Sequence, residues 1–253
     1  MKVVLIGAGN VATQLGRALY SKSFDIVQVY SRTETSASLL AKEIGAIAIT
    51  DISKIAIDAD FYIFSLKDSV LEDVLKQVPE NNGIWIHTAG SLPLDIFCPY
   101  TSRCGVLYPF QTFSKNREIC WAEIPLFVEA SDEAVLSEIR NMADKLSGKV
   151  YPLSSEKRKY VHLTGVFACN FSNHMYTLSK LFLAKVGLPF DVALPLIDET
   201  ANKVHTLSPE EAQTGPAVRY DENIIHKHLD LIEDEQIKKI YALLSESIHK
   251  MNK

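Results

Sequence analysis

The stretch VVLIGAGNVA, residues 3–12, decides the fold expected of this chain. Its first four residues form an all-apolar run, typical of a strand buried on both faces of a sheet. Gly7, Gly9 and Ala12 then follow the pattern G-x-G-x-x-[G/A], and residues 11–20 carry apolar side chains at helical spacing. Such a turn gathers free N–H groups and the positive end of a helix dipole where a pyrophosphate can bind. The stretch predicts a dinucleotide-binding βαβ unit; the alternative is a glycine-rich turn without a ligand.

The alternation of short apolar runs and helical patterns continues to about residue 152. We expect further strands at residues 26–30, 46–49, 61–64, 84–87, 106–108, 126–128 and 150–151, and helices at 36–43, 69–78 and 133–146. Strands that are apolar on both faces and separated by helices indicate an α/β, Rossmann-type, mostly parallel sheet.

Strand signals stop after about residue 153. Helical patterns cover residues 156–186, 190–207, 221–232 and 234–251, a capped helix start lies at Ser208, and residues 214–221 are predicted to be a loop. We therefore predict two domains, an α/β Rossmann domain over residues 1–153 and an all-helical domain over residues 154–253.

Composition and charge narrow the class of protein. The chain has 253 residues, 47% hydrophobic and 23% charged, and a net charge of -5. A weakly acidic chain argues against nonspecific nucleic-acid binding, which needs a basic face. The four cysteines match no metal-site spacing, so we expect no metal and free thiols in a reducing cytoplasm. Polar residues interrupt the N-terminal apolar run and no long apolar stretch occurs, so neither a signal peptide nor a membrane helix is expected.

The end of the second predicted strand favours NADP over NAD. An NAD site usually carries an acid about 20 residues after the glycines, to bind the ribose 2′-hydroxyl. Here the strand ends in Ser31, Arg32 and Thr33, and no carboxylate follows until Glu34. The guanidinium of Arg32 can pair with a 2′-phosphate, and the two hydroxyls can donate hydrogen bonds to it. The alternative is a solvated surface arginine.

Two later strand ends face the same crevice, because ligands in open α/β sheets bind at the carboxyl ends of strands. Residues 65–68 follow the fourth strand and are expected to run along the cofactor, and residues 87–91 follow the fifth strand, near the expected nicotinamide end. Lys67 could equally face solvent, and Asp68 could be a plain helix cap. The predicted cofactor-binding residues are Gly7, Ala8, Gly9, Asn10, Val11, Ser31, Arg32, Thr33, Ser65, Leu66, Lys67, Thr88, Ala89 and Gly90.

With these motifs the N-terminal half resembles pyrroline-5-carboxylate reductases, deazaflavin-dependent NADP oxidoreductases, and the β-hydroxyacid and 6-phosphogluconate dehydrogenases. Nearly the whole chain resembles NADP oxidoreductases in which a Rossmann-like domain precedes a helical domain of unknown function. This resemblance is carried by GVLYPFQTF (105–113), VFACN (166–170) and TGPAVRYD (214–221). Members of that family carry histidine before the proline of the first stretch. Tyr108 stands there in this chain, which counts against an acid–base role at this position.

Candidate catalytic residues lie in the second half. His162, Asn170 and His174 are spaced so that they share one face of a largely apolar helix. Asn170 matches the substrate-binding asparagine of the resembled β-hydroxyacid dehydrogenases, whose lysine is unmatched. His162 is then the available proton carrier. Both histidines could instead be satisfied core or interface groups.

Arg219 is the predicted anchor for an anionic substrate, since it could bind a carboxylate with two hydrogen bonds. It could instead pair with Asp198 or Glu199, and Asp221 could simply cap the next helix. Together these residues predict an NADP(H)-dependent oxidoreductase acting on a small carbonyl, imine or hydroxy compound between the domains. The alternatives are a non-catalytic NADP(H) sensor and deazaflavin chemistry. The resembled families also suggest a homodimer formed through the helical domain.

Overall fold

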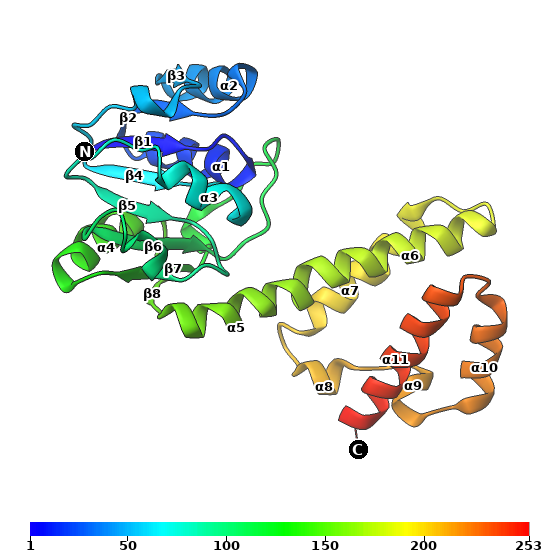
Figure 1. Ribbon diagram of the computed structural model, residues 1–253. Helices are drawn as coiled ribbons and strands as arrows, with labels where there is room; N and C mark the ends of the chain where they lie inside the picture. Colours follow the sequence, from blue (N-terminus) through cyan, green and yellow to red (C-terminus); the bar gives the residue numbers. More distant parts are fainter. Residues whose placement is uncertain (253) are drawn as a thin grey trace. The chain divides into compact units, whose positions relative to one another are not determined.

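The computed structural model describes residues 1–252 and contains two compact units. They are Met1–Asn173, here the Rossmann unit, and His174–Lys253, here the helical unit. Each is described by itself (Figure 1). The Rossmann unit is built on β1 (Lys2–Ile6), β2 (Asp25–Tyr30), β3 (Ile47–Ile49), β4 (Phe61–Phe64), β5 (Ile84–His87), β6 (Cys104–Pro109), β7 (Leu126–Ala130) and β8 (Val150–Pro152).

These strands form a single sheet of eight, in the order β3-β2-β1-β4-β5-β6-β7-β8. All neighbouring pairs are parallel except β6 and β7, which are antiparallel. The chain reverses its direction of travel across the sheet between β1 and β4, and in such sheets ligands bind outside the carboxyl ends of the strands at this point. The predicted Rossmann-type, mostly parallel sheet is confirmed.

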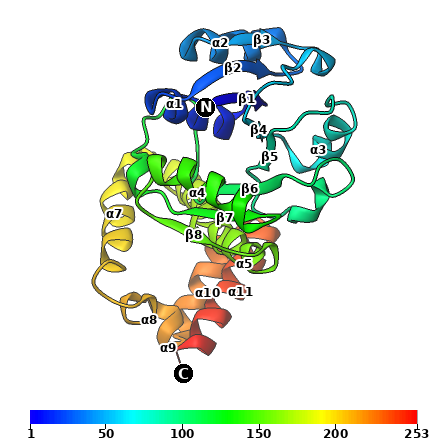
Figure 2. The same ribbon diagram turned by 90° about the vertical axis from the view of Figure 1, so that its left-hand side faces the viewer.

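Helices cover both faces of the sheet (Figure 2). Val3 and Leu5 of β1 pack in a core with α1 (Asn10–Ser21), α2 (Glu34–Ile44) and α4 (Glu133–Leu146). The alternate residues of the same strand, Val4 and Ile6, pack in a second core with α3 (Asp68–Leu75). Because successive strand side chains point to opposite faces, an all-apolar strand needs a cover on each side.

A long helical segment follows β8. It comprises α5 (Ser155–Gly165), a π-helical segment (Val166–Phe171) and α6 (Ser172–Lys185). The strands end at Pro152, where the sequence predicts the change to helices. The division between the compact units falls 20 residues beyond the predicted boundary at 153/154, because α5 and the π-helical segment belong to the Rossmann unit.

The helical unit contains most of α6 together with α7 (Leu194–Lys203), α8 (Pro209–Ala212), α9 (Pro216–Arg219), α10 (Glu222–Leu231) and α11 (Glu235–Met251). Ser208 and Glu211 form the predicted capping box at the start of α8. The predicted loop at residues 214–221 was partly wrong, since Pro216 starts α9 there. Asp221 caps α10 by accepting from the Ile224 amide at 3.3 Å. No helix within residues 1–252 is both long and apolar enough to cross a membrane.

Candidate functional site

The turn after β1 has the features that a bound pyrophosphate requires. Gly7 has a φ of 123°, and a Cβ there would lie 2.3 Å from the Ser65 carbonyl oxygen at the end of β4. Only glycine therefore fits this turn without displacing the neighbouring strand end. A Cβ on Gly9 would meet nothing within 4 Å, and no side chain of residues 1–252 caps the amides that begin α1. Open space above free helix amides fits an anionic ligand.

The end of β2 offers a cation and hydroxyl groups beside this turn. Arg32 is exposed, and its guanidinium forms no ion pair with any residue in the described part of the chain. Ser31 and Thr33 flank it, and Ser36 lies one turn further along, in α2. A 2′-phosphate can be held by an unpaired guanidinium and neighbouring hydroxyls. These groups fit NADP at the position where the sequence predicts it.

One cavity of about 630 Å³ joins these segments. All fourteen residues predicted to bind the cofactor line it, because the carboxyl ends of β1, β2, β4 and β5 meet at this edge of the sheet. Asp68 and Ser91, which lie in the two strand-end segments expected at this crevice, also line it, whereas sequence reasoning missed Tyr30, Ser36, Val70, Val74 and Tyr108. His162, predicted as a catalytic residue, lines the same cavity.

Two loop contacts shape the middle of this cavity. Thr88 donates to the Ser65 hydroxyl over 3.1 Å, which links the ends of β4 and β5. Ser91 donates to the carboxylate of Asp68. The alternative reading of Asp68 as an N-cap is wrong, since Lys67 occupies the cap position and Asp68 is the first residue of α3. Lys67 itself is exposed and lines the cavity.

The far end of the cavity holds a tyrosine–histidine pair. The hydroxyl of Tyr108 lies 3.2 Å from Nδ1 of His162. Burial raises the pKa of Tyr108 above its ordinary value, and the positive charge of Arg158 opposes the rise. A Cβ on Gly90 would lie 2.6 Å from His162 Nδ1 and 2.7 Å from Tyr108 Cζ. The absence of a side chain at Gly90 therefore lets Tyr108 and His162 pack directly on the loop after β5.

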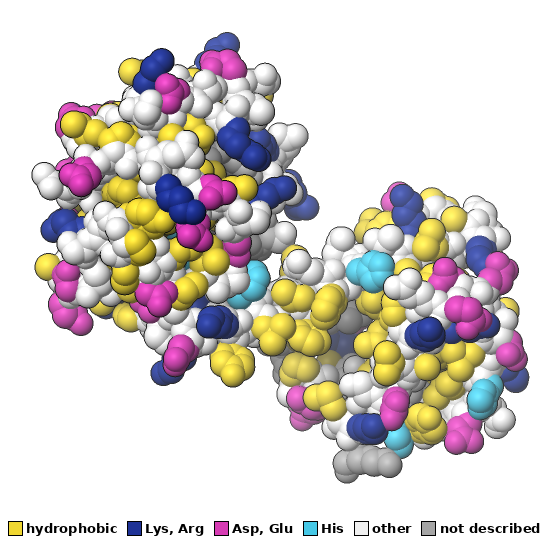
Figure 3. Space-filling model, in the orientation of Figure 1, with side chains coloured by type: hydrophobic (Ala, Val, Ile, Leu, Met, Phe, Trp, Pro, Cys, Tyr) yellow, Lys and Arg dark blue, Asp and Glu magenta, His cyan; other side chains and the backbone are white. Residues whose placement is uncertain are grey.

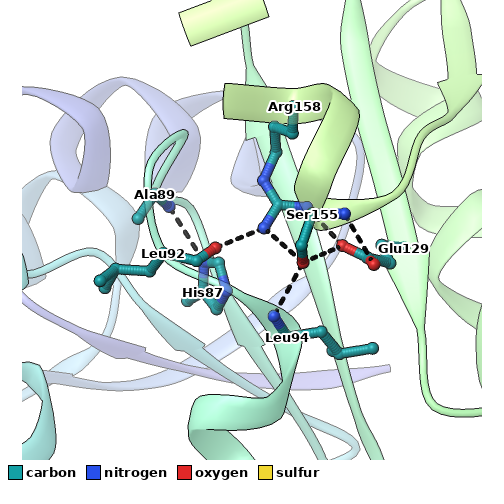
Figure 4. A network of polar contacts seen from close by, with 7 residues as sticks. All are labelled: His87, Ala89, Leu92, Leu94, Glu129, Ser155 and Arg158. Carbon is teal, nitrogen blue, oxygen red and sulfur yellow. Dashed lines mark hydrogen bonds and ion pairs between the residues drawn. The ribbon is translucent and has the colours of Figure 1, made fainter. Parts of the chain in front are cut away.

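A buried ion pair fastens α5, which carries His162, to the sheet. Arg158 is 1% exposed and pairs with Glu129 of β7, while its second terminal nitrogen donates to the Leu92 carbonyl in the loop after β5 (Figure 4). Ser155 joins the network by donating to Glu129 over 2.7 Å and accepting from the Leu94 amide at 2.9 Å. Arg158 thus links α5, which carries His162, to the loop after β5, which carries Gly90.

The network also sets the charge of Glu129. Burial alone would raise the pKa of this carboxyl, but hydrogen bonds from Ser155 and the ion pair with Arg158 bring it below its ordinary value. Glu129 is therefore ionised at neutral pH and balances the buried arginine.

His87 lies beneath this network at the end of β5. Its side chain is fully buried, and the Ala89 amide donates to Nδ1 over 3.2 Å, which assigns the ring proton to Nε2. Burial, followed by the positive charge of Arg158, lowers the pKa of His87 to about 3, against the smaller opposing effects of the Pro93 carbonyl and Glu129. His87 is a neutral packing residue at neutral pH.

Asn170 lines a neighbouring cavity of about 460 Å³, together with Tyr108 and His162. The structure thus brings these two predicted residues, His162 and Asn170, to one cavity. Their helix differs from the expected regular, largely buried α-helix, since a π-helical segment interrupts it. Leu163, Phe167 and Phe171 are 49%, 62% and 50% exposed. His174 belongs to the helical unit, and its role stays a prediction.

Arg219 is exposed at the end of α9 in the helical unit. It forms neither of the alternative ion pairs considered from the sequence, with Asp198 or Glu199, in the structure of residues 1–252. Its role as a substrate anchor stays a prediction.

Sequence reasoning missed Tyr108 and Arg158 as residues of this site. Tyr108 was set aside because it replaces a histidine of the resembled family, although a tyrosine hydroxyl can also carry a proton. Arg158 lies near the start of a helix whose other charged residues are exposed, and the sequence alone gives no sign that it is buried.

Two family models match the chain. "NADP oxidoreductase coenzyme F420-dependent" matches residues 2–87, and "Domain of unknown function (DUF2520)" matches residues 124–248. The crystal structure of a "putative NADP oxidoreductase" from Bacteroides fragilis is 50% identical in sequence with a TM-score of 0.92, and the match covers 98% of each chain. The chain belongs to the NADP oxidoreductase family. This membership confirms the predicted resemblance, enzyme class and cofactor, NADP, at the level of the family.

More distant structures share the fold. A 1-pyrroline-5-carboxylate reductase from Streptococcus pyogenes is 14% identical with a TM-score of 0.66, and the match covers 99% of this chain and 98% of that one. An imine reductase from Myxococcus stipitatus in complex with NADP+ is also 14% identical, with a TM-score of 0.68 and coverage of 100% and 93%. A search of curated proteins gives no match.

Proposed function

We propose that this family member is an NADP(H)-dependent oxidoreductase that transfers hydride to or from a small carbonyl, imine or hydroxy compound beside Tyr108 and His162. The observation that carries the proposal is the single cavity that contains the phosphate turn, Arg32 and the Tyr108–His162 pair. A cofactor held at one end of this cavity leaves a proton-carrying pair at the other.

The residues present fit the cofactor. The amides after Gly7 and Gly9 would hold the pyrophosphate, Arg32 with its neighbouring hydroxyls would hold the 2′-phosphate, and the loop at 88–90 would face the nicotinamide. When bound, NADPH supplies a hydride, two electrons and a hydrogen nucleus, to the carbon of a C=O or C=N bond. The oxygen or nitrogen must then gain one proton from the protein or from water.

Tyr108 and His162 are suited to hold that proton. The hydroxyl of Tyr108 is protonated at neutral pH, since burial raises its pKa further above neutrality, and it can give its proton to the substrate oxygen or nitrogen. A protonated His162, whose Nδ1 lies 3.2 Å from the Tyr108 oxygen, can then return a proton to that oxygen, and both transfers run in reverse during oxidation. The pair can therefore deliver a proton in reduction and accept one in oxidation. Asn170, on the adjoining cavity, would orient the substrate.

Two substitutions test the proposal, Tyr108→Phe and His162→Asn. NADPH oxidation would be followed with a panel of cyclic imines, ketones and 2-oxo acids, and NADPH binding by fluorescence titration. We expect each variant to bind NADPH with unchanged affinity and to turn over roughly 100-fold more slowly, the lower range for general acid–base catalysis. If both variants turn over substrate at the wild-type rate, Tyr108 and His162 do not act as the proton-carrying pair. NADPH binding without turnover of any compound would favour the sensor reading.

The description of the N-terminal family model supports a second candidate, hydride exchange between NADP and a deazaflavin cofactor. The adjoining cavity of about 460 Å³ lies within the usual range for a planar ligand of that size. Deazaflavin reduction by NADPH, measured by loss of its visible absorbance, separates this candidate from imine or carbonyl reduction.

We also propose that the chain forms a homodimer through its helical unit and works in the reducing cytoplasm. Many large apolar side chains of this unit are exposed in the single chain, and Figure 3 shows some of them gathered on one face. All four cysteines are free thiols, which is in keeping with a reducing compartment.

A further inference from the structure

A third cavity in the Rossmann unit has no part in the function described so far. It measures about 940 Å³ and adjoins the 460 Å³ cavity, since the two share Gln111, Thr112, Cys169 and Asn170 in their linings. The 460 Å³ cavity in turn shares Tyr108 and His162 with the cofactor cavity. The 940 Å³ cavity shares no lining residue with the cofactor cavity itself.

One wall of the 940 Å³ cavity comes from the π-helical segment. Cys169 and Asn170 lie in that segment and line both cavities beyond the Tyr108–His162 pair. A π turn adds a residue to the helical repeat and shifts the side chains that follow, and such turns are frequent at functional sites. The irregular turn therefore contains two of the four residues that line both cavities.

Another part of the lining comes from a loop whose backbone is held in place. The amide of Gln14, a residue of α1 that is 4% exposed, donates to the carbonyls of Ser114 and Arg117 over 2.6 and 2.8 Å. Arg17, one turn later, donates to the carbonyl of Lys115. A loop fixed by side chains of the cofactor-binding helix presents its own side chains from a defined position.

Two unpaired charges of opposite sign on that loop line the cavity. Arg117 and Glu118 both line the cavity, and neither forms an ion pair with any residue between 1 and 252. The remaining charged residue of the lining, Glu123, is already paired with Lys149 at 2.7 Å. The other polar groups are neutral amides, hydroxyls and thiols. A guanidinium and a carboxylate without partners are complementary to a ligand that carries both a carboxylate and an ammonium group.

We propose that the 940 Å³ cavity binds the zwitterionic, α-amino-acid end of an extended substrate, with Arg117 contacting its carboxylate and Glu118 its ammonium group. The inference rests on the proposed function, because the reacting C=O or C=N bond would lie in the adjoining cavity beside Tyr108 and His162. It narrows the substrate class to molecules whose charged end is remote from the reacting carbon.

The test uses four probes of one chain length, norleucine, hexanoate, hexylamine and hexanol, titrated calorimetrically with and without saturating NADP+. Norleucine should bind most tightly and should leave the affinity for NADP+ unchanged. Arg117→Gln should lower the affinities for norleucine and hexanoate about tenfold, which is the loss expected for a charge-assisted hydrogen bond. Glu118→Gln should lower the affinity for norleucine. It should raise the affinity for hexanoate about twofold, because a carboxylate that repels it is removed.

Matched controls are Arg140→Gln and Glu133→Gln on α4, which make the same changes of charge at residues that do not line the cavity. Both should leave the affinities for norleucine and hexanoate unchanged. The proposal is overturned if hexanoate or hexanol binds as well as norleucine, if no probe binds, or if norleucine competes with NADP+. If NADP+ binds normally but none of the four probes binds, the amino-acid site is rejected and the proposed function is not. Norleucine binding that depends on Arg117 in a chain that fails to bind NADP+ rejects the proposed function and leaves the cavity assignment intact.

Discussion

The Rossmann unit and the helical unit differ in how completely they bury their apolar side chains. The Rossmann unit encloses two cores, one on each face of its sheet, and its central strands β1, β4 and β5 are buried along almost their whole length. In the helical unit, as far as residue 252, Ala217, Ile225 and Ile232 are the only buried apolar side chains. Exposed ones there include Leu196 at 71%, Leu231 at 71% and Leu243 at 66%.

This difference teaches that the two units depend on different partners for their stability. A sheet with helices on both faces satisfies its own apolar surface within one chain. Monomeric proteins rarely expose large contiguous apolar patches, and those that occur usually mark an interaction surface. The catalytic proposal accordingly needs only the Rossmann unit, whereas the dimer proposal concerns the helical unit.

The largest expected effect concerns the internal support of the Rossmann unit. Arg158→Met removes one partner of a buried ion pair and leaves Glu129 uncompensated, so the free energy of unfolding should fall by about 3–5 kcal/mol. Urea denaturation followed by tryptophan fluorescence measures this, because both tryptophans, Trp85 and Trp121, belong to this unit. Arg140→Met removes an exposed pair with Asp144 and should change stability by less than about 0.5 kcal/mol. Equal effects would contradict a structural role for the buried pair.

The next largest effect is the pH dependence of the stability of the Rossmann unit. His87 has a pKa of about 3 when folded and about 6.5 when unfolded, so below pH 6.5 the unfolded state binds one more proton. Stability should fall with a slope of about 1.4 kcal/mol per pH unit from this residue as the pH drops from 6 towards 4. Glu129 acts in the same direction at lower pH, because protonation ends its pairing with Arg158.

His87→Phe should remove the histidine part of this slope in urea titrations at several pH values. His226→Phe, an exposed histidine of the helical unit, should leave the slope unchanged. An unchanged slope in the His87 variant would show that its ring is protonated in the folded protein.

A smaller effect tests the helical unit. If a second copy covers its apolar surface, Leu196→Glu places a charge in that interface and should weaken dimerisation at least about tenfold, or about 1.4 kcal/mol. Sedimentation equilibrium measures the association constant. Leu39→Glu, at a leucine of the Rossmann unit that is 62% exposed, should leave it unchanged. A monomeric wild-type chain would refute the dimer proposal.

The smallest expected effect is on cofactor preference. Arg32→Ala should lower the preference for NADPH over NADH roughly tenfold and leave NADH affinity unchanged, because only the 2′-phosphate loses a partner. Fluorescence titrations with NADPH and NADH give the ratio, and Lys42→Ala, at the other end of α2, is the control. Leu196→Glu should not alter the ratio if the cofactor site is confined to the Rossmann unit.

Most of the Rossmann unit could be predicted from its sequence. The apolar run before Gly7, the glycines themselves and Arg32 reflect local requirements, namely strand burial, a turn with positive φ and a cation at a strand end. Such requirements appear as residue types at fixed spacing, so the elements and the cofactor-lining residues followed from them. The regular helix expected over residues 156–186 failed, because the sequence carries no period that reveals a π turn.

By itself the sequence determined the βαβ turn, the alternation of strands and helices, and the caps at Ser208 and Asp221, since each depends on residues that are close along the chain. Only the tertiary structure decided that Tyr108 meets His162 over Gly90, that Arg158 is buried against Glu129, and that Arg117 and Glu118 stand unpaired at a cavity. The first two are contacts between residues far apart in sequence, and the third depends on which residues of the rest of the chain come near. Their energies depend on burial and distance, and neither quantity is written in the order of the residues.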